Sequence, residues 1–354
     1  MKKSSMPALK QKSVTVVIVV WNSERYIQDV LQSIIEQTYK DVTILVIDNG
    51  SIDETVKIIR TDFPQVRILQ NFRNLGFAKA YNQGMKLART DLVLIMNHDV
   101  IMHQDAVKQL VKATDRHPQA GSWSPKLYTL FVQDIDPESQ GSNLKEFIKS
   151  DKLDAAGLEV FKSRQVQNRG EGESDAPQYN TEREVFGFTG ACVLFSKDVL
   201  DQIAVRGQYF DETFFAYKED FDLSWRMLLY GFDHWFIPAA VGWHFRSFKR
   251  AANESVRAVV ANRRQASFLM KLHSLTNNQL VLIKNDDWQN FLKHLPWIIG
   301  RNIMMLGYSL FFDPGLLFKS VRMFFKALPT AISSRRIIKS HQQISPAKIR
   351  RWFK

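Results

Sequence analysis

The chain has 354 residues, of which 45% are hydrophobic and 24% charged, a globular composition that excludes wholesale disorder. A single cysteine, Cys192, excludes an intrachain disulfide and is typical of a reducing compartment, so we expect a cytoplasmic location. The net charge is +12, and residues 288–354 hold twelve Lys or Arg against one acid, Asp313. This tail therefore carries nearly all of the excess charge, which predicts an anionic partner for it.

Residues 1–13 form a basic, polar N-terminal tail without the apolar stretch of a secretory signal. Over residues 14–120, short apolar runs alternate with segments whose apolar residues recur at helical spacing. We predict strands at 14–20, 42–48, 66–70 and 92–97, and helices at 24–37, 54–63, 80–89 and 104–114. This alternation predicts an α/β fold with a mainly parallel central sheet flanked by helices.

The second half of the chain has a different pattern. Residues 131–185 are polar and contain Pro, Gly and acids, which predicts a long loop and a hairpin. Further on, we predict an apolar segment at 186–195, a helix at 221–230 that Gly231 closes, and an extended segment at 235–244. After about residue 250 the pattern becomes helical and basic.

Each of the four early strands is followed by a compact polar group. These groups are WNS at 21–23, DNGSID at 48–53, NFRNLGF at 71–77 and NHD at 97–99. In an open parallel sheet, ligands bind outside the carboxyl ends of the strands. Asn, Asp, Ser and Gly also serve as turn and helix-capping residues, and for any single group that reading is favoured. The four groups together favour a binding site.

The sequence lacks the loops that most often bind nucleotide phosphates. WNSERY, after the first strand, holds no glycine, and no phosphate-binding loop ending in Gly-Lys-Ser/Thr occurs. The diphosphate of a bound nucleotide would need another partner. A divalent cation held by Asp99, Mg²⁺ or Mn²⁺, is the natural candidate, because hard cations prefer carboxylate oxygens and often bridge phosphates.

Several motifs in order resemble one family. VVIVVWN at 16–22, then IDNGSID, NLGFAKAYNQG and MNHDV, resemble the bacterial family 2 inverting glycosyltransferases with the GT-A fold. GFTGACVLFSKDVL, FDETFFAYKEDFDLSWRMLLYG and IPAAVGWH resemble the acceptor-side half of that family, and LDAAGLEVFKSRQVQNRGEGE and REVFGFTGA resemble its rhamnosyltransferase-like members. The resemblance implies a catalytic domain at 14–250, with a nucleotide-sugar half at 14–120 and an acceptor half at 121–250. A helical basic extension at 251–354 follows.

The resemblance assigns the donor pocket. It implies that the nucleotide sugar is bound by Asn22, Asp48, Asn49, Arg73, Asn74, Gly76, Asn82 and Asn97. Asp48 and Asn49 match the pair that contacts base and ribose, and Asn49 stands where many relatives have Asp. Arg73 can offset phosphate charge, and Gly76 allows close approach of the backbone.

The resemblance also implies a metal site and a base. Asp99 and His244 match the metal ligands, and Asn97 replaces the first carboxylate of the family's Asp-any-Asp motif, which lowers the expected metal affinity. Asp220 matches the catalytic base, with Glu219 and Asp222 beside it as acceptor-binding residues. Acids also favour helix N-termini, and a lone histidine after an apolar run is often structural, so these simpler readings stay open.

The segment 291–325 places aromatic and aliphatic residues around occasional Lys and Arg. This composition is typical of interfacial helices on an anionic membrane surface. Such helices can equally dock on the catalytic domain and expose only their basic faces. No stretch approaches the roughly 20 apolar residues of a spanning helix. We therefore expect a protein peripheral to the inner face of the cell membrane.

The resemblance therefore predicts an enzyme that moves a sugar from a nucleoside-diphosphate sugar to a glycan or lipid-linked acceptor in cell-surface polysaccharide synthesis. The resemblance suggests dTDP-rhamnose as donor, and a different donor sugar is the first alternative. A nucleic-acid binder is another, suggested by the basic tail, but no nucleic-acid motif appears and we expect no such partner. Retention of Asp99, Asp220 and His244 argues against a catalytically silent GT-A fold. A nucleotidyltransferase would need a Gly-rich loop that is missing here.

Overall fold

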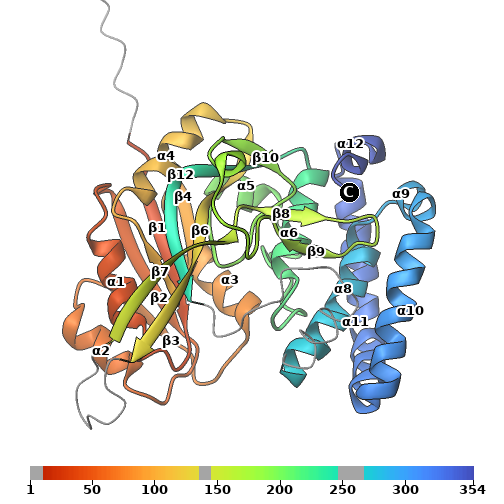
Figure 1. Cartoon of the computed structure of the whole chain (residues 1–354), viewed down its shortest axis with the longest axis horizontal. Coiled ribbons are helices and arrows are strands. Elements are labelled where there is room, and N and C mark those ends of the chain that lie inside the picture. Colours follow the sequence, from red (N-terminus) through yellow and green to blue (C-terminus); the bar gives the residue numbers. More distant parts are fainter. Residues whose placement is uncertain (1–10, 135–144, 246–266) are drawn as a thin grey trace, which may run out of the picture.

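The structure, a computed structural model, describes residues 11–134, 145–245 and 267–354. Most of the N-terminal tail and the junction expected near residue 250 lie outside these ranges. A central sheet flanked by helices occupies one side of the molecule, and the C-terminal helices stand together on the other (Figure 1). This arrangement confirms the predicted α/β architecture.

The central sheet has the strand order β10-β12-β6-β11-β4-β1-β2-β3. Its first half consists of β1 (Val14–Val20), β2 (Val42–Asp48), β3 (Arg67–Gln70) and β4 (Leu92–Asn97), paired in parallel as predicted. The later strands are β5 (Val100–Met102), β6 (Ala120–Asp134), β7 (Lys145–Ala155), β10 (Arg183–Val185), β11 (Cys192–Ser196) and β12 (Asp233–Phe245). Because β11 runs antiparallel to both β4 and β6, the sheet is mixed.

Helices cover both faces of the sheet. These are α1 (Ile27–Ile35), α2 (Thr55–Asp62), α3 (Phe77–Leu87), α4 (Ala106–Arg116), α5 (Lys197–Gln202) and α6 (Glu219–Leu229). Alternate residues of β1 point to opposite faces, so Val16 and Ile18 join the core under α1 and α4, while Val17 joins the core under α3 and α6. Burial on both faces explains why β1 is apolar throughout.

The segment 131–185 holds more strand than the sequence predicted. β6 extends to Asp134 and pairs with β7, and β8 (Leu158–Val160) forms a second hairpin with β9 (Val166–Asn168) before the short helix η1 (Pro177–Tyr179). In contrast, the apolar segment 186–195 becomes a strand only at Cys192, where β11 (Cys192–Ser196) begins. Before it, the backbone turns toward α6: Phe188 N bonds Ser224 Oγ and Gly190 N bonds Asp220.

The C-terminal helices are α8 (Phe268–Asn285), α9 (Trp288–Lys293), α10 (Leu295–Phe312), α11 (Pro314–Ser340) and α12 (Pro346–Arg350). The end of the chain packs on α6 and β8, where Phe353 lies edge-on to Trp225 and Lys354 N bonds Val160 O. Among the described residues no helix has the length and apolarity to span a membrane.

Candidate active site

The loops after β1 and β2 are tied together at the carboxyl end of the sheet. Asn22, exposed and at φ 49°, accepts a hydrogen bond from Ile52 N and donates its own N–H to Ser51 Oγ. The Asp48 carboxylate is buried and accepts from Ser51 N. Both side chains thereby shape the 48–53 loop at the place where a nucleotide was expected.

Asn49 organises the next loop along the edge. Its buried carboxamide donates to Asn74 Oδ1 over 3.0 Å and accepts from Leu75 N over 3.0 Å. An aspartate could not make the first of these bonds, since a carboxylate only accepts. Both functional groups of Asn49 are thus used by the protein itself, and Arg73 stays exposed at the tip of the loop.

Gly76 permits a close approach, but of another part of the chain. Its φ is 84°, and a Cβ built there would lie 2.5 Å from Phe215 O. Asn82 is buried and also faces the 208–217 segment: it accepts from Phe210 N and donates to Phe210 O and Glu212 Oε1. The sequence placed both residues on the donor, and in the structure both contact the 208–217 segment.

Asp99 and His244 meet where β5 and β12 pair. His244 Nε2 lies 3.2 Å from Asp99 Oδ1, and its Nδ1 lies 2.8 Å from Oδ2 of Asp154 on β7. Burial lowers the pKa of His244, but the two carboxylates outweigh that effect and raise it to about 10. Sequence reasoning missed Asp154; its only signal was a position in the quoted stretch LDAAGLEV.

This pair fits a divalent cation only if the substrate completes the site. Among the described residues no cluster of three or more His, Cys, Asp or Glu could hold a metal ion by itself. Asp99 and His244 offer one oxygen and one nitrogen, and Asp154 would orient the ring from Nδ1. Mg²⁺ commonly takes one or two carboxylates and fills its remaining positions with substrate phosphates and water. Asn97, which the resemblance assigned to the nucleotide sugar, accepts a hydrogen bond from the Tyr81 hydroxyl through its Oδ1.

Asp220 lies in the first turn of α6, mostly buried. Its Oδ2 accepts from Gly190 N over 3.1 Å and its Oδ1 from Phe221 N over 2.7 Å. Ala191, which follows Gly190, accepts from Asn97 N through its carbonyl oxygen. The segment Gly190–Ala191 therefore connects Asp220 to the Asn97–Asp99 turn. The Asp220 carboxyl group and the Asp99–His244 pair therefore lie along one connected edge of the site.

Glu219, next to it, has a different environment. It is 6% exposed, and its Oε2 has no hydrogen-bond partner among the described residues. Burial, and then the charge of Asp220, raise the pKa of Glu219 to about 8. Burial also raises the pKa of Asp220, but two N–H donors favour its anion. The backbone donors thus favour the anion at Asp220, and burial favours the proton at Glu219.

The turn before α6 has a strained backbone. Tyr217 and Lys218 are consecutive non-glycine residues with φ of 70° and 76°, a conformation that costs about 1–3 kcal/mol per residue. Asn277 of α8, fully buried, donates to the carbonyls of Ala216 (3.0 Å) and Tyr217 (2.8 Å). The C-terminal extension thus holds the turn that presents Glu219 and Asp220, a role that no sequence signal indicated.

Asp222 does not fit the expected contact with an acceptor. It is 0% exposed, its Oδ2 accepts from Lys284 Nζ and its Oδ1 from Asn285 Nδ2, each over 2.7 Å. Lys284 also bonds Asp211 over 2.6 Å. The prediction that Asp222 binds the acceptor was wrong because its side chain faces α8. The sequence did not indicate that α8 packs beside this helix.

A comparison of the chain with known protein families identifies one family. The family model of glycosyl transferase family 2 matches residues 15–204, which contain β1–β4, the Asn97–Asp99 turn and Gly190. The chain therefore belongs to glycosyl transferase family 2 and is a glycosyltransferase.

Among curated proteins, the chain is 25% identical over 274 residues to the N-acetylglucosaminyl-diphospho-decaprenol L-rhamnosyltransferase of Mycobacterium tuberculosis, covering 73% of this chain and 84% of that protein. It is also 29% identical over 126 residues to the poly-beta-1,6-N-acetyl-D-glucosamine synthase of Staphylococcus aureus, covering 34% of this chain and 30% of that protein. The resemblance to rhamnosyltransferases expected from the sequence is thereby confirmed.

Solved structures agree on the fold. GalNAc-T7, crystallised with UDP, GalNAc and Mn²⁺, superposes with a TM-score of 0.59 at 15% identity, over 94% of this chain and 58% of that one. The mannosyltransferase PcManGT from Pyrobaculum calidifontis, in complex with GDP-Man and Mn²⁺, gives 0.50 at 15% identity, over 97% and 88%. The predicted GT-A fold is confirmed.

Proposed function

We propose that this enzyme transfers a sugar from a nucleoside-diphosphate sugar to an acceptor hydroxyl with inversion at the anomeric carbon, and that Asp220 is the general base. The observation that carries the proposal is the pair of unlike carboxyl groups at the start of α6. Two N–H groups favour the anion of Asp220, while burial favours the neutral form of the adjacent Glu219. A base of this kind must be ionised at working pH and lie within reach of the acceptor.

In the proposed reaction the acceptor hydroxyl loses its proton to the Asp220 carboxylate. The acceptor oxygen forms the bond to the anomeric carbon from one face, and the bond to the diphosphate oxygen breaks on the other. Burial and the charge of Asp220 raise the pKa of Glu219 to about 8, which disfavours a second negative charge beside the base at neutral pH. Asp99 and His244 are the residues that would hold Mg²⁺ or Mn²⁺, which when bound neutralises charge on the diphosphate.

We further propose rhamnose as the sugar, with dTDP-rhamnose as donor and a lipid-linked glycan as acceptor. The rhamnosyltransferase relative supports this choice, since its name specifies a diphospho-decaprenol acceptor and it aligns with 73% of this chain. Incubation with dTDP-rhamnose, acceptor and Mg²⁺ or Mn²⁺ should give a product whose anomeric configuration, read by NMR, is opposite to that of the donor. Retention of configuration would exclude a single displacement, and transfer only from another nucleotide sugar would exclude rhamnose.

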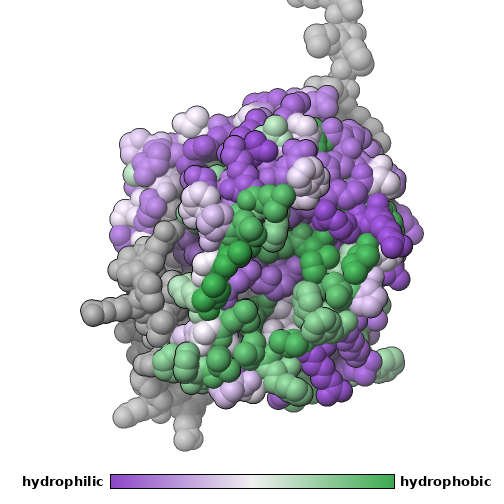
Figure 2. All heavy atoms as spheres, turned by 90° about the vertical axis from the view of Figure 1, so that its right-hand side faces the viewer, coloured by the Kyte–Doolittle hydropathy of each residue, from purple (hydrophilic) through white to green (hydrophobic). Residues whose placement is uncertain are grey.

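A peripheral position on an anionic membrane is the last part of the proposal. The helices α10 and α11 expose large apolar side chains, among them Ile303 (65%), Phe311 (81%) and Phe318 (72%). Hydrophobic residues gather across the face that these helices form (Figure 2). Patches of this kind mark interaction surfaces, and the basic excess of the tail suits anionic lipid.

A further inference from the structure

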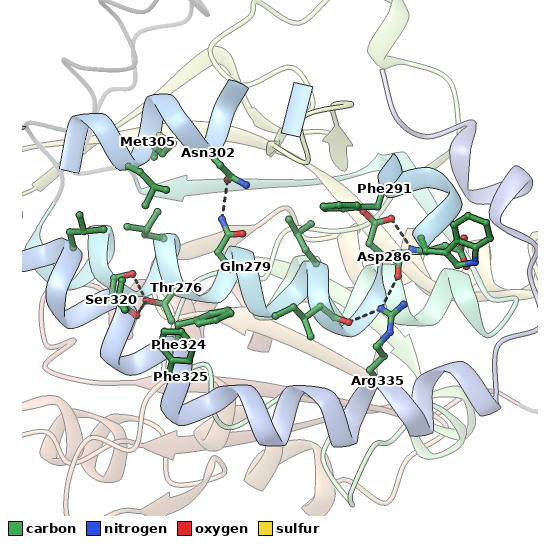
Figure 3. Close-up of a pocket in the computed structure, with 18 residues that line it drawn as sticks. Thr276, Gln279, Asp286, Phe291, Asn302, Met305, Ser320, Phe324, Phe325 and Arg335 are labelled. Carbon is green, nitrogen blue, oxygen red and sulfur yellow. Dashed lines mark hydrogen bonds between the residues drawn. The ribbon is translucent and has the colours of Figure 1, made fainter. Parts of the chain in front are cut away.

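A cavity of about 690 Å³ lies between α8, α10 and α11, behind the helix that holds the catalytic turn. Figure 3 shows its walls, with side chains from all three helices pointing into it. Apolar residues line most of it, including Leu275, Leu282, Met305, Leu306 and Phe324. Its size is within the usual range for small-molecule sites, about 300–1,000 Å³.

The polar side chains of the wall are largely bonded to one another. Gln279 Nε2 donates to Asn302 Oδ1 over 3.0 Å, which links α8 to α10, and the Thr276 and Ser320 hydroxyls share a hydrogen bond of 2.9 Å, which links α8 to α11. At one end Arg335 donates to backbone carbonyls. A ligand therefore meets mainly apolar surface, and the cavity favours an apolar occupant.

The mouth of the cavity adjoins an amphipathic surface. On α11 an exposed apolar stripe, Phe318, Val321 and Phe325, runs beside an exposed basic stripe, Lys319, Arg322 and Lys326. The two sets are offset by one residue, so they lie on neighbouring sides of the helix. Val321 and Phe325 also line the cavity. An apolar chain leaving the cavity would thus find cations at its polar end.

We propose that this cavity binds the isoprenoid chain of the lipid-linked acceptor, with the basic stripe beside the acceptor's diphosphate. The inference rests on the lipid-linked acceptor proposed above. A second copy of this chain suits the surface poorly, because two tails of net charge +11 would be brought together. A flat bilayer contact would use the exposed apolar stripe but leave the cavity without an occupant.

The position of α8 connects this cavity to catalysis. Asn277 holds the Ala216–Tyr217 carbonyls on one side of the helix, while Leu275, Gln279 and Leu282 line the cavity on other sides. Since a helix is about 10–12 Å across, a chain bound here lies about one helix width from the catalytic turn.

Titration calorimetry of the full-length protein with geranylgeranyl diphosphate, below its micellar concentration, tests the cavity without turnover. Leu306→Trp and Val321→Trp narrow the cavity from α10 and from α11. Leu310→Trp and Ile332→Trp add the same bulk to exposed positions of the same helices that do not line it. We expect the first pair to bind the probe at least about tenfold more weakly, and the second pair to bind like the wild type.

The outcomes separate this inference from the proposed function. Loss of probe binding in the first pair alone supports the cavity even if no transfer from dTDP-rhamnose is found. Absence of binding by the wild-type protein, or equal binding by all four variants, overturns it. The cavity is also excluded as the chain site if the first pair loses affinity for phosphatidylglycerol vesicles but keeps its affinity for the probe, since that identifies a bilayer contact.

Discussion

Two adjacent carboxyl groups, Glu219 and Asp220, differ because their hydrogen-bond donors differ. Gly190 N and Phe221 N stabilise the Asp220 anion, and no described group bonds Glu219 Oε2. The order of ionisation therefore follows from backbone geometry. Burial, and then the charge of Asp220, keep the proton on Glu219 to higher pH, and its Oε2 has no donor among the described residues to oppose this.

This order predicts how activity depends on pH. Because only the Asp220 anion can accept a proton, kcat/KM should fall as pH drops through its raised pKa. In the wild type we expect a second change in kcat/KM near pH 8, as Glu219 ionises beside the Asp220 carboxylate. Glu219→Gln should keep transfer at pH 7 within a few-fold and lose the change near pH 8. A variant that retained this change would show that another group titrates there.

At this scale the sequence selected residues that the structure brings close together, and their roles stay predictions. Asp99, His244 and Asp220 were selected by motif, and the structure brings them to one edge. Asn49 and Asn82 were assigned to the donor, but their carboxamides bond other parts of the chain. Partners distant in sequence decide what an amide does, and a single sequence does not reveal those partners.

Among the elements, α8 holds the turn that precedes Glu219 and Asp220. Asn277→Ala removes two hydrogen bonds from a turn with two positive φ values. We expect kcat to fall about tenfold or more while the KM for the donor changes little, because a displaced base loses reactivity rather than binding. The matched control is Asn278→Ala, a buried neighbour whose side-chain amide has no hydrogen-bond partner among the described residues. Equal loss of kcat in both variants would contradict a positioning role.

The same helix is fastened to α6 by a buried charge cluster. Lys284→Met leaves Asp211 and Asp222 buried without their cation, which should lower the free energy of unfolding by about 3–5 kcal/mol. The lysine holds the pKa of Asp211 below its usual value, so this stabilisation is present at neutral pH and declines as pH falls below about 4. Chemical denaturation measures it, with the exposed Lys57→Met as control. A loss under about 1 kcal/mol would contradict the account.

Element boundaries followed from periodicity where burial is regular. β4 spans Leu92–Asn97 as predicted, since an unbroken apolar run matches a strand covered on both faces. The apolar segment 186–195 becomes a strand only at Cys192, because the preceding backbone bonds Ser224 and Asp220 instead of a neighbouring strand. Such side-chain partners leave no periodic pattern.

For the whole molecule, charge and exposed apolar surface lie in the same C-terminal helices. The sequence left open whether these helices dock on the catalytic domain or face a membrane. The structure shows docking for α8, which bonds the turn before α6, and for the chain end, while α10 and α11 expose apolar residues. Docking thus applies to α8 and to the end of the chain. A membrane contact through α10 and α11 stays a prediction.

Replacing Lys319, Arg322 and Lys326 with Gln tests that prediction. Each basic residue near an anionic surface contributes about 1 kcal/mol, so binding to phosphatidylglycerol vesicles should weaken about a hundredfold. A control that removes the same charge from the exposed residues Lys57, Lys86 and Lys112 of the catalytic domain should bind as the wild type does. Co-sedimentation at low and high salt measures both. Equal weakening of the two variants would mean that net charge alone matters.

The central claim is that Asp220 takes the proton from the acceptor. Asp220→Asn retains the shape of the side chain but cannot accept that proton, so transfer should fall about 10²–10⁴-fold. Donor binding, followed by calorimetry with dTDP-rhamnose and Mg²⁺ or Mn²⁺, should remain within about twofold of the wild type, because this residue acts on the acceptor. Loss of turnover with intact donor binding is the predicted result, and near-wild-type turnover of Asp220→Asn would contradict the account.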